Sequence, residues 1–233
     1  MFTTPESRLI LPLDVADRAE AERLVKETEG VVGVYKIGLE FALAGGIDLA
    51  RDLSVAGVPV FLDMKLLDIA NTVASAVRTA GALKVKFLTV HAYPQALAAA
   101  IAAAPAGLNI VAVTVLTSFD DGDLESAGYT VGTADLAARR IASAQELGAH
   151  AIVCSPREAT RASQTGLPVI TPGVRMEEDA AGDQKRVATP GRAIVAGADA
   201  IVVGRPISRA ADVRGAAERY RDAIGDALLA RTR

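Results

Sequence analysis

The chain has 233 residues, of which 51% are hydrophobic and 23% are charged, and its formal net charge is −3 at pH 7. This length and composition suit one globular domain with a substantial core, and the slightly acidic charge gives no electrostatic reason to expect a nucleic-acid partner. The single cysteine, Cys154, cannot form an internal disulfide, so we expect a reducing, cytoplasmic setting and a buried structural thiol.

Short β-rich runs recur along the chain and are separated by alanine-rich amphipathic segments. In chain order the runs are RLILPLDV (8–15), GVYKIG (33–38), VPVFLDMK (58–65), FLTVHA (87–92), NIVAVTVL (109–116), AIVCS (151–155), PVITPGV (168–174) and AIVVGR (200–205). The segments between them, such as 17–30, 71–82 and 133–149, carry apolar residues at three- and four-residue spacing and a glycine near the end. That pattern is typical of helices.

Near-continuous apolar strands that alternate with helices predict a parallel sheet covered by those helices. Eight such units in 233 residues fit a closed (β/α)8 barrel, the TIM barrel of the α/β class. A doubly wound open sheet is the alternative, but it usually has fewer strands and a glycine-rich first turn, whereas DVADRAEA follows the first strand here. No linker or low-complexity segment divides the chain, so we expect a single barrel domain over residues 1–233.

The stretch from Ala96 to Leu116 is apolar enough to raise the question of a membrane span. Pro105 and Gly107 divide it into an alanine-rich, helix-like half and a β-branched half, which argues against a span. The N-terminus lacks a basic region followed by a long apolar segment, so we expect no signal peptide. The sequence therefore predicts a cytoplasmic protein that does not act at a membrane.

Polar residues gather at the predicted carboxyl ends of the strands, where TIM barrels place their chemistry. They are Asp14, Lys36, Asp63, Lys65, His91, Thr117, Ser118, Arg175, Gly204 and Arg205. Because side chains alternate along a strand, Asp63 and Lys65 are expected side by side at the barrel mouth, with Asp68 just past the strand.

Each of these residues also has an ordinary structural explanation. An Asp-x-Lys pair at a strand end is often a structural ion pair, and a lysine such as Lys36 often reaches solvent. His91 fits a hydrogen-bonded residue of the barrel mouth better than a metal ligand, because the only other histidine is His150. The small number of such ligands excludes a structural zinc site. Convergence of several strand ends on one place favours a functional site.

The segment DMKLLDIANT (63–72) resembles the Asp-x-Lys-x-x-Asp signature of orotidine 5′-monophosphate decarboxylases. Further matching motifs follow in order along nearly the whole chain: LDVAD at the first strand, YKIG at the second, VLTS at the fifth, TPGVR at the seventh, AGDQKR after it and VVGRPI at the eighth. Two places depart from the family pattern: Ala70, where proline is common, and Tyr93 with Pro94, where small residues are usual. Both departures lie in loops, so they bear on the expected shape of these loops more than on the expected activity.

The resemblance implies decarboxylation of orotidine 5′-monophosphate to uridine 5′-monophosphate in de novo pyrimidine biosynthesis, with no metal or other cofactor. Loss of carbon dioxide leaves a carbanion at C6, and Lys65 would stabilise and then protonate it. The implied catalytic network consists of alternating charges on Lys36, Asp63, Lys65 and Asp68.

The resemblance also implies how the nucleotide is held. Arg175, Arg205 and the Gly204 amide would bind phosphate, Gln184 would link phosphate to pyrimidine, Thr117 would contact the base, and Asp14 and Lys36 would hold ribose hydroxyls. The position of Gly204 and Arg205 after the last strand also matches the usual phosphate site of such barrels. The polar segment 171–186 is typical of a lid, although an ordinary surface loop explains its composition equally well.

In the family pattern, the residues corresponding to Asp68 and Thr72 cross a dimer interface into the neighbouring subunit's site. The resemblance thus implies a homodimer in which each subunit completes the other's site.

Two other functions remain open from the sequence. A related aldolase such as hexulose-6-phosphate synthase shares Asp-x-Lys-x-x-Asp but uses magnesium, and it generally has a glutamate ligand where this chain has Lys36, whose ammonium repels a divalent cation. A catalytically silent barrel that binds a nucleotide for regulation is the other possibility. Retention of all four network charges argues against the silent barrel.

Overall fold

The computed structural model describes residues 1–177 and 188–231. Eight parallel strands follow one another around a closed barrel, and the last strand pairs with the first. They are β1 (Leu9–Pro12), β2 (Val34–Ile37), β3 (Val60–Leu66), β4 (Phe87–His91), β5 (Asn109–Val113), β6 (Ala151–Val153), β7 (Val169–Pro172) and β8 (Ala200–Val202). The closed barrel confirms the predicted TIM-barrel class, and every strand lies inside one of the eight predicted runs or extends one residue beyond it.

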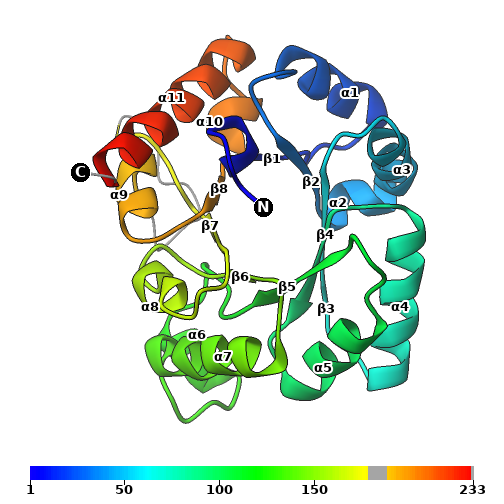
Figure 1. Ribbon diagram of the computed structural model, residues 1–233, viewed down its shortest axis with the longest axis vertical. Helices are drawn as coiled ribbons and strands as arrows, with labels where there is room; N and C mark the ends of the chain where they lie inside the picture. Colours follow the sequence, from blue (N-terminus) through cyan, green and yellow to red (C-terminus); the bar gives the residue numbers. More distant parts are fainter. Residues whose placement is uncertain (178–187, 232–233) are drawn as a thin grey trace.

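Helices form a ring outside the strands (Figure 1). The longer ones are α1 (Arg18–Glu27), α3 (Ile47–Val55), α4 (Ala70–Ala82), α5 (Pro94–Ala103), α7 (Thr133–Leu147) and α11 (Val213–Arg231). Shorter pieces are η1 (Glu6–Arg8), α2 (Leu39–Phe41), η2 (Ala42–Gly46), α6 (Asp121–Ser126), α8 (Ala159–Ser163), α9 (Pro190–Val195) and α10 (Arg205–Ser208). The three segments with helical periodicity became α1, α4 and α7, which confirms those predictions.

The apolar stretch that raised the membrane question divides as expected into helix α5 and strand β5. Within residues 1–177 and 188–231, no helix combines the length and apolar character that crossing a membrane requires. Cys154, just after β6, is fully buried and packs in the core between barrel and helices, as expected of a structural thiol.

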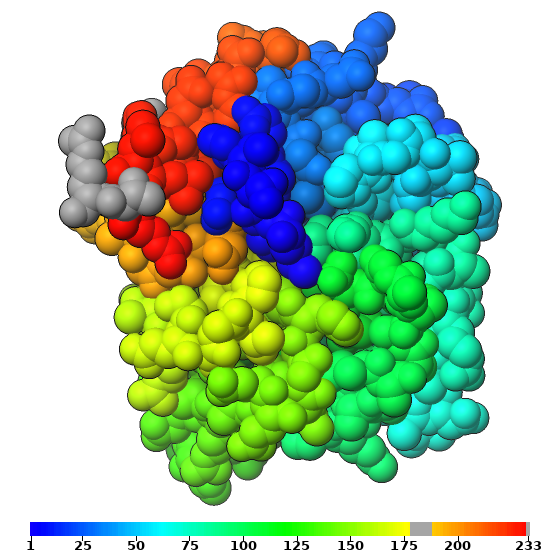
Figure 2. Space-filling model, in the orientation of Figure 1, coloured from blue at the N-terminus to red at the C-terminus, as the bar shows by residue number. Residues whose placement is uncertain are grey.

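One buried side chain from each strand fills the inside of the barrel. These residues are Ile10, Val34, Phe61, Phe87, Val111, Ala151, Ile170 and Ala200. Phe2 stacks on Phe87 with ring centroids 5.7 Å apart and joins the same cluster. Figure 2 shows the blue N-terminal segment lying across the middle of this face of the molecule. The amino end of the barrel is therefore filled and covered, and space for a ligand is left toward the carboxyl end.

Two residues further along each strand, the next inward-facing positions form a second ring. Its members are Pro12, Lys36, Asp63, Thr89, Val113, Val153, Pro172 and Val202. Of these eight, only Lys36, Asp63 and Thr89 are polar, and they come from the adjacent strands β2, β3 and β4. The fold thus concentrates polar groups in one sector of an otherwise apolar ring.

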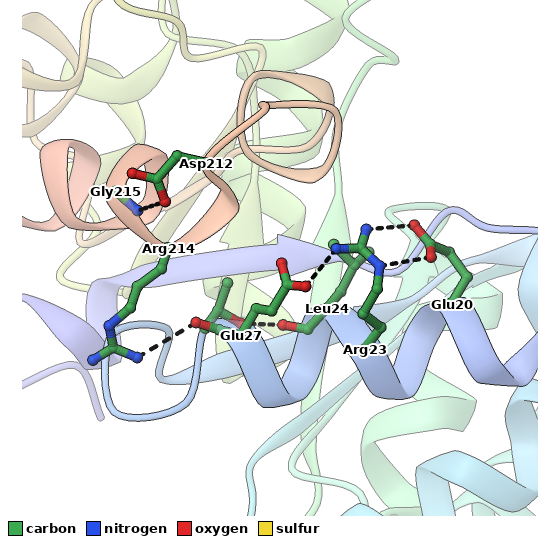
Figure 3. A network of polar contacts seen from close by, with 8 residues as sticks. Glu20, Arg23, Leu24, Glu27, Asp212, Arg214 and Gly215 are labelled. Atoms are coloured by element: carbon green, nitrogen blue, oxygen red, sulfur yellow. Dashed lines mark hydrogen bonds and ion pairs between the residues drawn. The ribbon is translucent and has the colours of Figure 1, made fainter.

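The last helix returns to the first and completes the ring of helices. Arg214 of α11 donates to the backbone carbonyl of Glu27 at 3.4 Å, and Arg23 of α1 pairs with Glu20 and Glu27 at 2.7 Å (Figure 3). Arg214 also donates to the Glu29 carbonyl at 3.2 Å. Exposed pairs of this kind each contribute roughly 0–1 kcal/mol. The buried apolar faces of the helices therefore supply most of the stability here.

Candidate active site

The carboxyl end of the barrel contains a cavity of about 440 Å³, a size suited to a small-molecule ligand. The structure brings eight of the residues singled out from the sequence to its walls: Asp14, Lys36, Asp63, Lys65, Thr117, Arg175, Gly204 and Arg205. They come from the ends of six strands or from the loops that follow them. The convergence inferred from strand ends is thus present in the fold.

Charged side chains of alternating sign run along one wall. The Lys36 Nζ lies 3.3 Å from Asp14 Oδ1 and 3.4 Å from Asp63 Oδ2, and the Lys65 Nζ lies 2.9 Å from both Asp63 oxygens. Lys36 is only 9% exposed, so the interpretation of this residue as a strand-end lysine that reaches solvent is wrong. Two carboxylates flank its buried ammonium, so each carboxylate forms an ion pair with it.

The backbone near Lys36 is shaped around these charges. In the YKIG motif, a Cβ on Gly38 would lie 3.0 Å from both Asp14 Oδ1 and Lys36 Nζ. Any side chain at this position would therefore crowd the ion pair. Glycine lets the chain pass close to the charged groups as it leaves β2.

Asp63 is the centre of this arrangement. Burial by itself would raise the pKa of its carboxyl group, but attraction to Lys36 and Lys65 and hydrogen bonds from Lys65 and Thr89 together hold the pKa below its usual value. The carboxylate stays ionised and accepts hydrogen bonds from Lys65 and from Thr89. It thereby anchors the Lys65 ammonium at the edge of the cavity.

Strand β3 departs from regular geometry where it carries Lys65. Its register against β4 shifts between Leu62 and Leu66, and Lys65 has a φ of +47°, which is uncommon for a residue with a side chain. Asp63 and Lys65 do lie side by side as predicted, but simple strand alternation is only part of the reason. The irregular backbone at Lys65 completes the geometry, and no pattern in the sequence predicts it.

Asp68 and Thr72 do not line the cavity of their own chain. Both are exposed, and the Asp68 Oδ1 accepts a hydrogen bond from the backbone amide of Ile69 at 2.7 Å. Within one chain the charge network therefore joins Asp14, Lys36, Asp63 and Lys65.

The opposite wall carries the predicted phosphate-binding groups. Arg175 lies just after β7, and its buried Nε has no hydrogen-bond partner in the described parts of the chain. Gly204 packs so close to Pro12 that a Cβ would lie 3.0 Å from the proline ring, and Arg205 follows at the start of α10. Gln184 and most of the predicted lid fall in residues 178–187, outside the described residues.

The expectation of a hydrogen-bonded His91 is wrong for one ring nitrogen. The buried Nδ1 has no hydrogen-bond partner within residues 1–177 and 188–231, and the ring stands edge-on to Tyr93 with centroids 6.4 Å apart. Burial and the nearby positive charges of Arg140 and Lys65 lower the pKa of His91, although Asp63 opposes them. Among the described residues, no group of three or more His, Cys, Asp or Glu side chains is arranged to hold a metal ion.

Tyr93, one of the departures from the family pattern, belongs to a small polar cluster beside the site. Its hydroxyl contacts that of Tyr129, and the Arg140 guanidinium lies 4.6 Å from its ring centroid. Arg140 also donates to the Thr114 carbonyl at 2.5 Å, just past β5. The side chain at position 93 thus links the loop after β4 to Arg140 of α7.

Several polar residues of the site were not predicted from the sequence, among them Ser208 and Arg209 on the cavity wall. Glu40 lines the cavity, and Thr89 donates to Asp63 from the neighbouring strand. Counting inward positions along FLTVHA would have pointed to Thr89, because it shares a face with Phe87 and His91. Glu40 lies in a helix that starts directly after the YKIG motif, and no pattern in the sequence identified it.

Replacing Lys36 with methionine removes one of the two cations beside Asp63, so we expect the pKa of the Asp63 carboxyl to rise. A pH titration followed by NMR of the carboxyl carbon measures this, and Lys26→Met on the exposed face of α1 is the control. Because the folded-state pKa is lowered from 3.8, ionised Asp63 stabilises the fold above that pH and loses this effect as the pH falls through the lowered value. An Asp63 pKa that is the same in Lys36→Met and wild type would contradict the assigned contact.

Comparison with known proteins agrees with the geometry. Residues 7–220 match the model of the "Orotidine 5′-phosphate decarboxylase / HUMPS family". Orotidine 5′-phosphate decarboxylases from Afipia carboxidovorans and Methylorubrum extorquens are 52% and 51% identical, covering 92% and 96% of this chain and 93% and 97% of the relatives. The crystal structure of the Lactobacillus acidophilus orotidine 5′-phosphate decarboxylase superposes with a TM-score of 0.81 at 30% identity, covering 93% of this chain and 98% of that one. The chain belongs to the orotidine 5′-phosphate decarboxylase / HUMPS family.

Proposed function

We propose that this protein converts orotidine 5′-monophosphate to uridine 5′-monophosphate and carbon dioxide without a metal or other cofactor. The observation that carries the proposal is the Lys65 ammonium, held 2.9 Å from both oxygens of buried Asp63 at the wall of the cavity. The relatives named for this activity support it through identities near 50% over almost the whole chain.

The chemistry requires a fixed positive charge beside C6 of the pyrimidine. When the C6–carboxylate bond breaks, carbon dioxide leaves and its electron pair stays on C6 as a carbanion. The Lys65 ammonium stabilises that charge and then transfers a proton to C6, which completes uridine 5′-monophosphate. Asp63 keeps the ammonium oriented, and Lys36 on its other side keeps Asp63 ionised.

The far wall suits the phosphate. Arg175 has a buried Nε with no partner in the parts of the chain that the structure describes, and such a donor gains a strong charge-assisted bond from an anion. Arg205 and the Gly204 amide follow the last strand, where barrels of this class often bind phosphate. Thr117 on the cavity wall suits the base, and Asp14 with Lys36 suits the ribose hydroxyls. Gln184 is assigned to the link between phosphate and pyrimidine by resemblance alone.

A second copy of the chain is the partner we assign to the surface around Asp68. Large apolar side chains are exposed after β2 and β3: Leu39 at 57%, Leu43 at 90%, Leu67 at 49% and Ile69 at 69%. Exposed apolar side chains of this size in two loops that follow adjacent strands favour a protein interface. By resemblance, the interface is that of a symmetric homodimer in which Asp68 and Thr72 reach the partner's cavity.

A magnesium-dependent aldolase is the alternative within the related barrels. Lys36 opposes it, because its ammonium lies 3.3 Å from Asp14 and 3.4 Å from Asp63, where it competes with a divalent cation for the same carboxylates. We therefore expect the proposed decarboxylation to continue when a chelator removes divalent cations.

The direct test is to incubate the purified protein with orotidine 5′-monophosphate and excess chelator and to follow the loss of substrate absorbance. We expect uridine 5′-monophosphate to form, and Lys65→Met to lower kcat by at least about 10³-fold, since proton transfer and charge stabilisation each supply roughly 10²–10³. Lys26→Met is the matched control and keeps wild-type turnover. Activity that disappears with the chelator, or that survives Lys65→Met, would rule out the proposed mechanism.

The phosphate assignment predicts a substrate-dependent effect of Arg205→Ala. The variant should lose about 10²-fold in kcat/KM on the nucleotide, because each bond to a charged group contributes roughly 1.5–3 kcal/mol. It should leave turnover of the phosphate-free nucleoside, orotidine, nearly unchanged. Arg51→Ala, on the outer helix α3, serves as the control. Equal losses on both substrates would mean that Arg205 does not bind the phosphate.

The dimer assignment predicts complementation between two inactive variants. Lys65→Ala and Asp68→Ala subunits with different tags are co-expressed, and the mixed dimer is purified. One of its two sites carries both substitutions and the other carries neither, so we expect about half of the wild-type activity per dimer. A mixed dimer as inactive as its parents would mean that Asp68 acts within its own chain.

A further inference from the structure

We propose that Thr89 is a positioning residue: its hydroxyl links the Asp63 carboxylate to the backbone of Lys65 and so aims the Lys65 ammonium into the cavity. This inference rests on the proposed decarboxylation and adds to it a residue outside the charged network. Thr89 does not itself line the cavity, so it acts through Asp63 and Lys65.

The hydroxyl of Thr89 uses its donor and an acceptor position at the same time. It donates to Asp63 Oδ1 at 2.9 Å and accepts from the Lys65 backbone amide at 2.8 Å. The directions are fixed, because an ionised carboxylate can only accept and an amide N–H can only donate. Thr89 is fully buried, so both bonds form away from bulk water. The Thr89 side chain therefore holds the Asp63 carboxylate and the Lys65 backbone amide in fixed positions relative to each other.

The bond to the amide falls at the irregular point of β3. Lys65 has a φ of +47°, and a left-handed backbone is unfavourable for a residue with a side chain. The strand register against β4 shifts around the same residue. Thr89 offers the Lys65 amide a partner in this conformation, which offsets the cost. The conformation in turn lets the Lys65 ammonium contact both oxygens of Asp63.

The ring of inward-facing residues shows why this position matters. Thr89 is the β4 member of the ring that contains Lys36 on β2 and Asp63 on β3. Asp63 is thus held by a cation on one side and by a hydroxyl on the other. Without the hydroxyl, Asp63 Oδ1 loses a donor and the Lys65 amide loses its acceptor. Both losses leave the Asp63–Lys65 pair free to rotate.

Thr89→Val removes the hydroxyl and keeps the branched shape, whereas Thr89→Ser keeps the hydroxyl. The control is Thr28→Val at the end of α1, because Thr28 is also fully buried but its hydroxyl bonds to the Leu24 carbonyl and the Tyr35 hydroxyl, away from the cavity. A purely structural role would appear as lower stability alone. A positioning role lowers kcat with little change in KM, since misplacing a reacting group by about 1 Å can cost roughly 10²-fold.

We expect Thr89→Val to lower kcat for orotidine 5′-monophosphate by about 10²-fold with KM within about 3-fold of wild type, and Thr89→Ser to restore most of the loss. Thr28→Val should keep the wild-type kcat. In a Lys65→Met background, Thr89→Val should cause no further loss, because both changes act on one group. Wild-type kcat in Thr89→Val, failure of serine to rescue, or an additive loss in the double variant would overturn the inference.

Two further measurements keep the outcomes distinct. Should Thr89→Val fail to fold, Thr89→Cys replaces it, because a thiol is a weaker donor and acceptor than a hydroxyl and should give a smaller loss in the same direction. Should wild type not decarboxylate the nucleotide, the proposed function fails, and NMR titration of the Asp63 carboxyl then tests the contact alone. Loss of the Thr89 bond should raise that pKa, and an unchanged value would overturn the contact as well.

Discussion

A single buried carboxylate organises the site. Asp63 contacts Lys36 at 3.4 Å and Lys65 at 2.9 Å, and its side chain is only 12% exposed. An isolated charge at this depth would be costly, but two ammonium groups compensate it. The same contacts fix the Lys65 ammonium in place before any ligand binds. Preorganised charge is what a reaction through a carbanion needs, because no reorganisation is then required when the charge develops.

The barrel makes this charge cluster possible by dividing its interior into layers. The amino end is filled by apolar side chains such as Phe61 and Phe87, with Phe2 stacked beneath them. One layer higher, polar residues from three adjacent strands replace the apolar ones, and the cavity opens above them. The charged residues pack against this apolar layer. The loops that follow the strands lie around the cavity, where they can bind different parts of a ligand.

The sequence predicted the barrel, its strands and most of the cavity wall, because alternation and strand ends follow directly from periodicity. It did not predict the left-handed backbone at Lys65 or the hydroxyl of Thr89 beneath it, since both depend on the register between two strands. Strand periodicity predicts that His91 points inward, but whether its ring nitrogens form hydrogen bonds depends on neighbours that are distant in sequence. Lys36 was ambiguous for the same reason: only the packed structure shows that it is buried between two acids.

The most direct test of the central claim is to isolate carbanion stabilisation from loss of carbon dioxide. Uridine 5′-monophosphate is incubated with the protein in D2O, and exchange of its C6 proton is followed by proton NMR. If the Lys65 ammonium, held by Asp63, stabilises a carbanion at C6, wild type should catalyse exchange and Lys65→Met should not. Exchange at the same rate in both proteins would contradict the account.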